Sequence, residues 1–272
     1  MLGSTERSFP GRYSRCVFLL AALGGAYLLI PTSAMAQENY EIQVYGSELV
    51  PVGHTMVELH SNFTIDGRTT TVDGLAPTDH ALHETLEVTH GFSDWFEVGF
   101  YMFTSVRNGS GWDWVGDHIR PRLSIPARWG WPVGLSLSQE IGYQRRRFSP
   151  DTWTWEIRPI IDKQMGRWYW AFNPTFERAL VGEGVHQGFE FSPNAQVTFD
   201  VTPQVTAALE YYGALGPVTG FDPLQDQEQQ IFPSIDLNVS PDWELNFGVG
   251  RGFTRSTDHL LVKAIVGYRL AF

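Results

Sequence analysis

The sequence predicts an all-β protein: a transmembrane, up-and-down antiparallel β-barrel of about 12 strands that follows a cleaved signal peptide. Three observations predict it. Apolar and polar residues alternate with a period of two over most of the chain, the connections between these segments alternate between short and long, and an export signal stands at the N-terminus. The predicted parts are a signal peptide (1–36), an N-terminal periplasmic arm or plug (37–54) and the barrel (55–272).

The export signal has three segments. Arg7, Arg12 and Arg15 precede an apolar run over residues 16–30, and alanines at positions 34 and 36 then provide an A-x-A-like cleavage site. A membrane anchor is the alternative, but a run of roughly 15 residues is shorter than the ~20 that a spanning helix needs. We therefore expect residues 1–36 to be removed on export.

Cleavage would change the chemistry available to the mature chain. It would remove the only cysteine, Cys16, and with it any disulfide, thiol nucleophile or cysteine metal ligand. Lys+Arg would fall from 19 to 16 and Asp+Glu from 30 to 29, which leaves a net charge of −13. So acidic a chain, without a basic run, argues against nucleic acid as a partner. No mature segment approaches 18 consecutive apolar residues, so helical spans are not expected.

Twelve segments alternate with the period of a β-strand, which places apolar residues on one face and polar residues on the other. An even number lets both ends of a closed barrel lie on the same side of the membrane. The segments are 57–63, 82–88, 96–102, 118–125, 133–141, 153–162, 168–177, 189–199, 205–211, 231–239, 243–249 and 260–272.

The connections alternate in length, as they do in outer-membrane barrels with short periplasmic turns and long outer loops. Tryptophans cluster at the predicted short turns, where an interfacial aromatic girdle is expected; they are Trp95, Trp129, Trp131, Trp168 and Trp243. Short turns are expected near 91–94, 127–131, 163–167, 200–203 and 240–242, and longer loops near 65–79, 106–116, 146–151, 178–187, 214–228 and 254–258.

Prolines interrupt five of the predicted strands. Because proline cannot donate to a strand ladder, we expect bulges or local breaks in the ladder at these positions. The prolines are Pro121, Pro159, Pro174, Pro193 and Pro233.

The last segment ends on an aromatic residue, with Tyr268, Leu270 and Phe272 on one face. This ending resembles the C-terminal recognition signal of bacterial outer-membrane barrels, which implies outer-membrane lipid and the barrel-assembly machinery as partners. The hairpin pattern over 55–272, with its Asp-Trp-x-Glu turns, is also similar to uncharacterised transporter-like barrels linked to phenol meta-degradation loci. That second resemblance carries no site residues.

Alternation alone does not separate a membrane barrel from a soluble sandwich, which would turn its charged face to water. The export signal, the tryptophans, the loop asymmetry and the terminal aromatic favour the barrel. In a barrel the charged face lines the lumen, where charges are expected to pair because an isolated buried charge is costly. The candidate lumen charges are Arg120, Arg122, Glu140, Glu156, Arg158, Asp162, Glu177, Glu190, Lys263 and Arg269.

A zinc site and a hydrolase site are the two chemical alternatives to ordinary polar residues in the lumen. A candidate inward polar cluster could bind zinc, but no tight ligand spacing appears, so hydrogen-bonded residues without metal or cofactor are expected. Its members are Glu58, His60, His83, Glu87 and His118. Outer-membrane lipid hydrolases place His and Ser at i and i+2, whereas His60 and Ser61 are neighbours that point to opposite faces. No catalytic residue is predicted.

The sequence therefore predicts an outer-membrane channel or transporter for small solutes, passive or facilitated, with specificity in the lumen and in loops 65–79 and 214–228. The charged faces of the segments hold more acids than bases, so a water-filled lumen would prefer cations. A structural or surface-binding barrel with a closed lumen is the alternative, and a lipid-acting hydrolase is less favoured. Residues 37–54 could form an arm, a short strand or a lumen plug.

Overall fold

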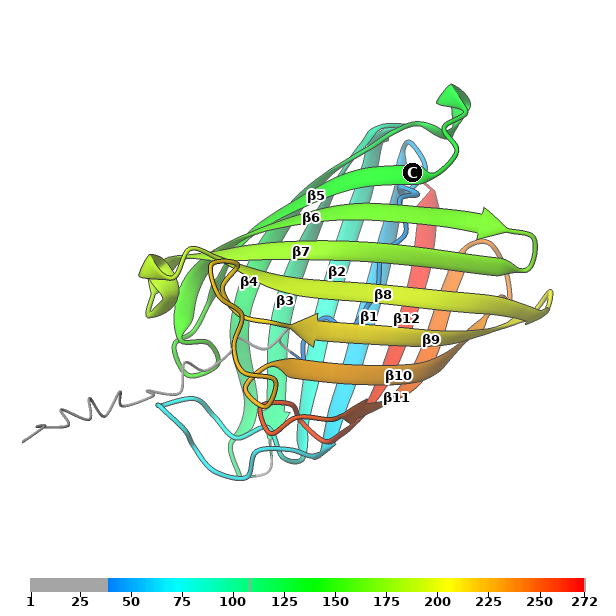
Figure 1. Cartoon of the computed structure of the whole chain (residues 1–272). Helices are drawn as coiled ribbons and strands as arrows, with labels where there is room; N and C mark the ends of the chain where they lie inside the picture. Colours follow the sequence, from blue (N-terminus) through cyan, green and yellow to red (C-terminus); the bar gives the residue numbers. More distant parts are fainter. Residues whose placement is uncertain (1–38, 108, 272) are drawn as a thin grey trace, which may run out of the picture. The chain divides into compact units, whose positions relative to one another are not determined.

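A computed structural model describes residues 39–107 and 109–271. Within this part of the chain, twelve antiparallel strands follow one another around a closed barrel, and β1 pairs with β12 to complete it (Figure 1). The strands are β1 (His54–Asp66), β2 (Ala81–Ser93), β3 (Phe96–Arg107), β4 (Gly111–Ser124), β5 (Gly134–Gln144), β6 (Asp151–Met165), β7 (Trp168–Gly182), β8 (Phe189–Thr202), β9 (Val205–Ala214), β10 (Glu228–Leu237), β11 (Trp243–Gly252) and β12 (Leu260–Ala271).

The connections confirm the expected alternation with two corrections. The short turn expected over 127–131 is a longer connection, because β4 ends at Ser124 and β5 begins at Gly134. Trp95 and the tryptophans of the other short turns are about half exposed at one end of the barrel, and the 3₁₀ turn Ala127–Trp129 lies at that same end. The long loop expected over 106–116 is wrong, because β3 continues to Arg107 and β4 begins at Gly111. A second 3₁₀ turn, Gly184–His186, lies in the loop between β7 and β8.

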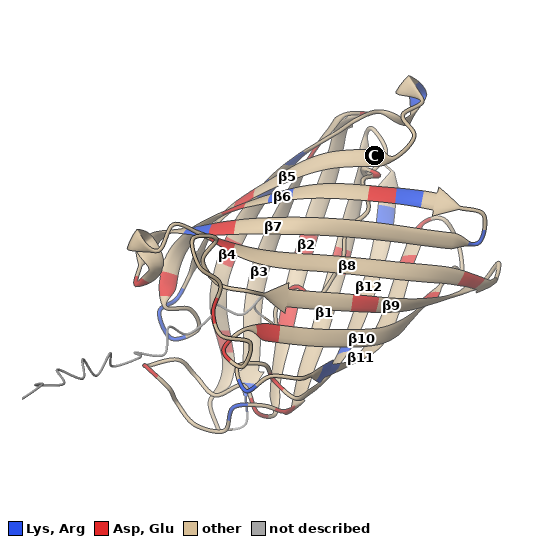
Figure 2. Cartoon of the chain, viewed as in Figure 1, with Lys and Arg blue, Asp and Glu red and all other residues tan. Residues whose placement is uncertain are grey.

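The two faces of the sheet differ as the alternation predicts. Apolar side chains such as Phe100, Leu209 and Val249 are about half exposed on the outside, where lipid would contact them. Polar and charged side chains fill the inside, and charged residues recur along most strands (Figure 2). None of the helices among the described residues is long and apolar enough to cross a membrane.

The prolines affect the strand ladder in two ways. At Pro121, Pro159 and Pro233 the pairing to one neighbouring strand lapses for two or three residues and then resumes in the same register. Pro174 lies opposite Pro159 and shares that interruption, but on its other side it faces Pro193 within a continuous β7–β8 pairing. The ladder breaks expected at prolines are therefore confirmed at Pro121, Pro159, Pro174 and Pro233, whereas the register shifts occur elsewhere, for example between Phe103 and Thr104.

Candidate functional site: the lumen and its N-terminal arm

Residues 39–53, here called the arm, run through the barrel before β1 begins. At one end the Asn39 side chain donates a hydrogen bond to Asp258, 2.5 Å away in the loop between β11 and β12. At the other end the Gly53 amide donates to the carbonyl of Gly91, 2.8 Å away beside the short β2–β3 turn. The arm therefore passes from the long-loop end of the lumen to the short-turn end.

Inward side chains of the barrel form hydrogen bonds with the backbone of the arm, as a neighbouring strand would in a sheet. The Asn173 amide accepts a hydrogen bond from the Tyr45 N–H at 2.8 Å and donates one to the Tyr45 carbonyl at 2.9 Å. Lys263 donates to the Ile42 carbonyl at 3.0 Å. Gln196 donates to the carbonyl of Val44, two residues further along the arm, also at 3.0 Å. These bonds satisfy backbone groups that would otherwise be buried without partners.

The arm near the short turns is held by charged side chains. Arg122 donates to the carbonyls of Gly46 and Glu48, at 3.1 and 2.6 Å. Asp162 accepts hydrogen bonds from both the N–H and the hydroxyl of Ser47. Arg122 and Asp162, predicted as lumen charges, thus bind the arm.

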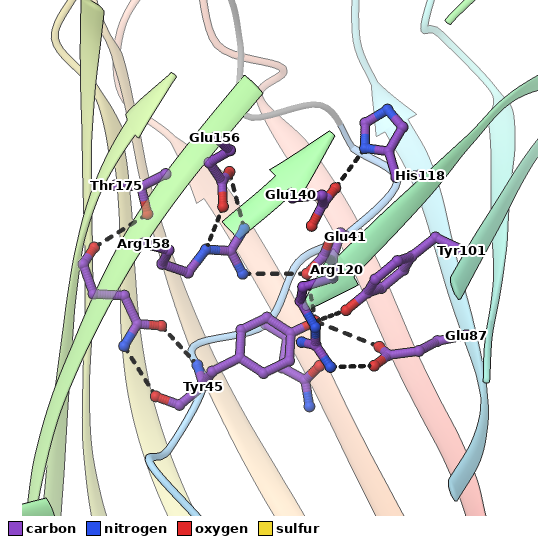
Figure 3. A network of polar contacts seen from close by, with 12 residues as sticks. Glu41, Tyr45, Glu87, Tyr101, His118, Arg120, Glu140, Glu156, Arg158 and Thr175 are labelled. Carbon is purple, nitrogen blue, oxygen red and sulfur yellow. Dashed lines mark hydrogen bonds and ion pairs between the residues drawn. The ribbon is translucent and has the colours of Figure 1, made fainter. Parts of the chain in front are cut away.

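Tyr45 occupies the centre of this network (Figure 3). The guanidinium groups of Arg120 and Arg158 lie 4.7 and 5.0 Å from the centre of its ring, a cation–π arrangement. Its hydroxyl donates to Glu41, another arm residue. Tyr45 is itself buried, at 7% exposure.

The lumen arginines form ion pairs, but not all with the expected neighbours. Arg120 pairs with Glu87 at 2.8 Å and Arg122 with Glu97 at 2.8 Å. Arg158 reaches Glu156 at 2.8 Å and the arm carboxylate of Glu41 at 3.2 Å (Figure 3). Glu140, expected between the arginines, bonds instead to His118.

Four glutamates form one continuous row across neighbouring strands. Glu140 of β5 lies opposite Glu156 of β6, which lies opposite Glu177 of β7, which lies opposite Glu190 of β8. All four line a lumen cavity of about 70 Å³ beside the arm. The row lies in the half of the barrel near the long loops, because β6 begins at Asp151 on that side.

The candidate polar cluster is divided in the structure. Glu58, His60 and Glu87 come together on β1 and β2, with ligand atoms within 4.8 Å of one another. His83 packs edge-on against Tyr40 of the arm, with ring centres 4.6 Å apart. His118 belongs to the acidic row through its bond to Glu140.

The remaining predicted residues lie away from Tyr45, although Lys263 also bonds to the arm. Lys263 pairs with Glu210 at 2.5 Å, and Arg269 borders a second lumen cavity near the short turns. Tyr268 is 40% exposed on the outside and packs against Trp243, with ring centres 4.8 Å apart. Leu270 follows on β12, whereas Phe272 and the predicted signal peptide lie outside the described residues.

The histidine–serine pair is separated as expected. His60 is buried in the lumen, while the Ser61 hydroxyl donates to Glu84 at 2.8 Å from the opposite face. A base and a nucleophile on opposite faces of one strand cannot share a proton.

Sequence reasoning missed Tyr45 and Asn173. Asn173 had a usable signal, since its position in the alternation places it inside the barrel. Tyr45 had no such signal, because apart from Glu41 its partners lie 42 to 128 positions away in the sequence.

The sequence matches no protein-family model and no curated protein. Among solved structures, the fold is similar to the COG4313 outer membrane channel from Pseudomonas putida F1, with a TM-score of 0.58 at 11% identity, covering 85% of this chain and 100% of that one. It is also similar to the NanC porin, with a TM-score of 0.53 at 7% identity, covering 79% and 99%. The fold, with its apolar outer face, is that of a β-barrel of the bacterial outer membrane.

Proposed function

We propose that the barrel is a passive channel for small solutes, with a preference for cations and with the arm as its plug. The row of Glu140, Glu156, Glu177 and Glu190 carries this proposal, because it lines a lumen cavity beside the arm. Like charges directly opposite one another destabilise a sheet, so such a row costs stability that a purely structural wall would not need. Rings of carboxylates in a pore favour cations.

Only part of this row contacts basic side chains. Arg158 pairs with Glu156, and His118 bonds to Glu140. Between residues 39 and 271, position 108 aside, no ion pair reaches Glu177 or Glu190. These two carboxyl groups are the ones that a passing cation would meet.

The attachment of the arm supports its role as a plug. Its hydrogen bonds run mostly to side chains, so it can leave without breaking the strand ladder that closes the barrel. A second lumen cavity, of about 600 Å³, already lies beside residues 43–50. Withdrawal of the arm would join the spaces on its two sides.

Deletion of residues 39–50 from the mature protein tests this function. In planar bilayers the intact protein should show small or infrequent conductance steps, and the deletion variant should conduct severalfold more, because the plug no longer fills the lumen. Heat-modifiable migration on gels would verify that the variant still forms a barrel. Two folded forms that conduct equally little at every voltage would refute the channel and support the closed-lumen alternative.

The two resemblances in the sequence belong to this proposal as well. Tyr268, Leu270 and Phe272 are proposed to direct assembly by the barrel-assembly machinery, and deletion of Phe272 should then lower the inserted fraction in cells severalfold, whereas an unchanged fraction would contradict this role. The similarity to transporter-like barrels of the phenol meta-degradation type supports transport as the function without naming a cargo.

A further inference from the structure

A second row of acids crosses the seam where the barrel closes. Glu58 of β1 lies opposite Glu87 of β2 on one side and opposite Gly267 of β12 on the other. Gly267 in turn lies opposite Glu244 of β11. The row is in the half of the lumen near the short turns, four residues from the start of β1.

Gly267 provides the space in which two of these carboxyl groups meet. A Cβ atom at this position would lie 2.7 Å from Cγ of Glu58 and 3.2 Å from Cβ of Glu244. Without it, the Glu58 and Glu244 side chains converge on the same space across the strand between them. Two carboxylates that converge in this way are stabilised by a shared proton or a cation.

His60 adds a nitrogen ligand to the same place. It lies two residues beyond Glu58 on the same face of β1, and its side chain is completely buried. Within residues 39–107 and 109–271, neither ring nitrogen has a hydrogen-bond partner, and Nε2 lies 3.4 Å from Oε2 of Glu87. A buried imidazole with only this one long contact is costly unless something else binds it.

Among the carboxyl groups of this row, basic side chains pair only with Glu87 in the described part of the chain. Arg120 pairs with Glu87 at 2.8 Å and lies 3.5 Å from Glu97. In the described part of the chain, no lysine or arginine forms an ion pair with Glu58 or Glu244. Glu244 receives only a neutral donor from the arm, the Gln43 amide at 2.9 Å. The ion pairs therefore leave Glu58 and Glu244, which converge at Gly267, without a basic partner among the described residues.

We propose that Glu58, His60 and Glu87 bind a divalent first-row transition cation such as Zn²⁺, with Glu244 as a fourth ligand. Imidazole and carboxylate are the ligand types that such ions accept, at ~2.0–2.2 Å from the metal. Ligand atoms within 4.8 Å of one another need to move only a little to reach one ion. The cavity of about 600 Å³ is lined by Glu58, Glu87 and Glu244 and gives an ion access.

The ion would stabilise the closed form of the barrel. It would join β1, β2 and β11 across β12, at the seam where the first and last strands meet. It would also add stability by mass action, because the unfolded chain does not hold these ligands together.

The test is metal binding by the tag-free mature protein, folded in detergent and stripped with a chelator. Titration with Co²⁺ should give ligand-field absorption that saturates at one ion per barrel and is displaced by Zn²⁺. Zn²⁺ should raise the unfolding temperature, whereas Mg²⁺ at the same concentration should not. His60→Gln and Glu58→Gln should each weaken Co²⁺ binding roughly tenfold or more.

Two histidine variants serve as matched controls. His83→Gln removes another buried lumen imidazole without hydrogen-bond partners, and His80→Gln removes an exposed one that pairs with Asp79. Both should bind Co²⁺ as the unaltered protein does. If His60→Gln fails to fold, Glu244→Gln replaces it as the test variant. Absence of saturable binding, or equal binding in the test and control variants, would overturn the proposal and leave shared protons as the occupants.

Discussion

Asn173 shows how one inward side chain can replace a neighbouring strand. Its amide makes the two hydrogen bonds to Tyr45, N–H and C=O, that an adjacent backbone would make in a sheet. The side chain is fully buried, so water cannot take its place. Loss of the amide leaves two buried backbone groups without partners, at about 1–3 kcal/mol each.

Asn173→Leu should therefore loosen the arm. The single cysteine, Cys16, lies in the predicted signal peptide, so a Val44→Cys reporter would be the only thiol in the mature chain. With a loss of about 2 kcal/mol, labelling of this buried position by a charged maleimide should accelerate roughly 30-fold.

Asn194→Leu is the matched control for this measurement. Asn194 lies directly opposite Asn173 on β8 and is equally buried, but its side chain makes none of the arm's hydrogen bonds. Labelling should stay close to that of the reporter alone. Equal acceleration in both variants would mean that general loosening of the wall, rather than the lost amide, releases the arm.

At the scale of elements, the strands were predictable because their signals are local. A period of two and the turn residues lie within about ten positions of one another, and all twelve segments fall within observed strands or extend them by a few residues. The error over 106–116 has the same local origin. Gly109 and Gly111 adopt positive φ angles of 79° and 70°, which allows a tight turn where the polar composition indicated a long loop.

The arm and the second acidic row were not predictable in this way. The arm alternates for only a few residues, and the groups that bind it come from strands that are distant in sequence, such as β7 and β12. The second row joins Glu58 and Glu244 only because the barrel closes and a glycine separates them. Neither closure nor strand register follows from periodicity, so spacing in the sequence gave no indication of ligands.

At the scale of the whole molecule, acids lie in two rows on different parts of the wall. One row crosses β5 to β8 near the long loops, and the other crosses β11, β12, β1 and β2 near the short turns. A solute that passes through the lumen meets both rows in turn. Arginines near the middle, around Tyr45, divide the two acidic regions.

This arrangement predicts a cation preference that depends on the first row. With residues 39–50 deleted to open the lumen, the reversal potential in a KCl gradient should indicate K⁺ over Cl⁻ by severalfold. The double substitution Glu177→Gln and Glu190→Gln should move this ratio toward unity, because these two carboxylates have no ion pair among the described residues. Glu84→Gln is the control, since Glu84 bonds to Ser61 on the outer face and should leave the ratio unchanged. Anion preference in the deletion variant, or an equal effect of the control, would show that the acidic row does not set selectivity.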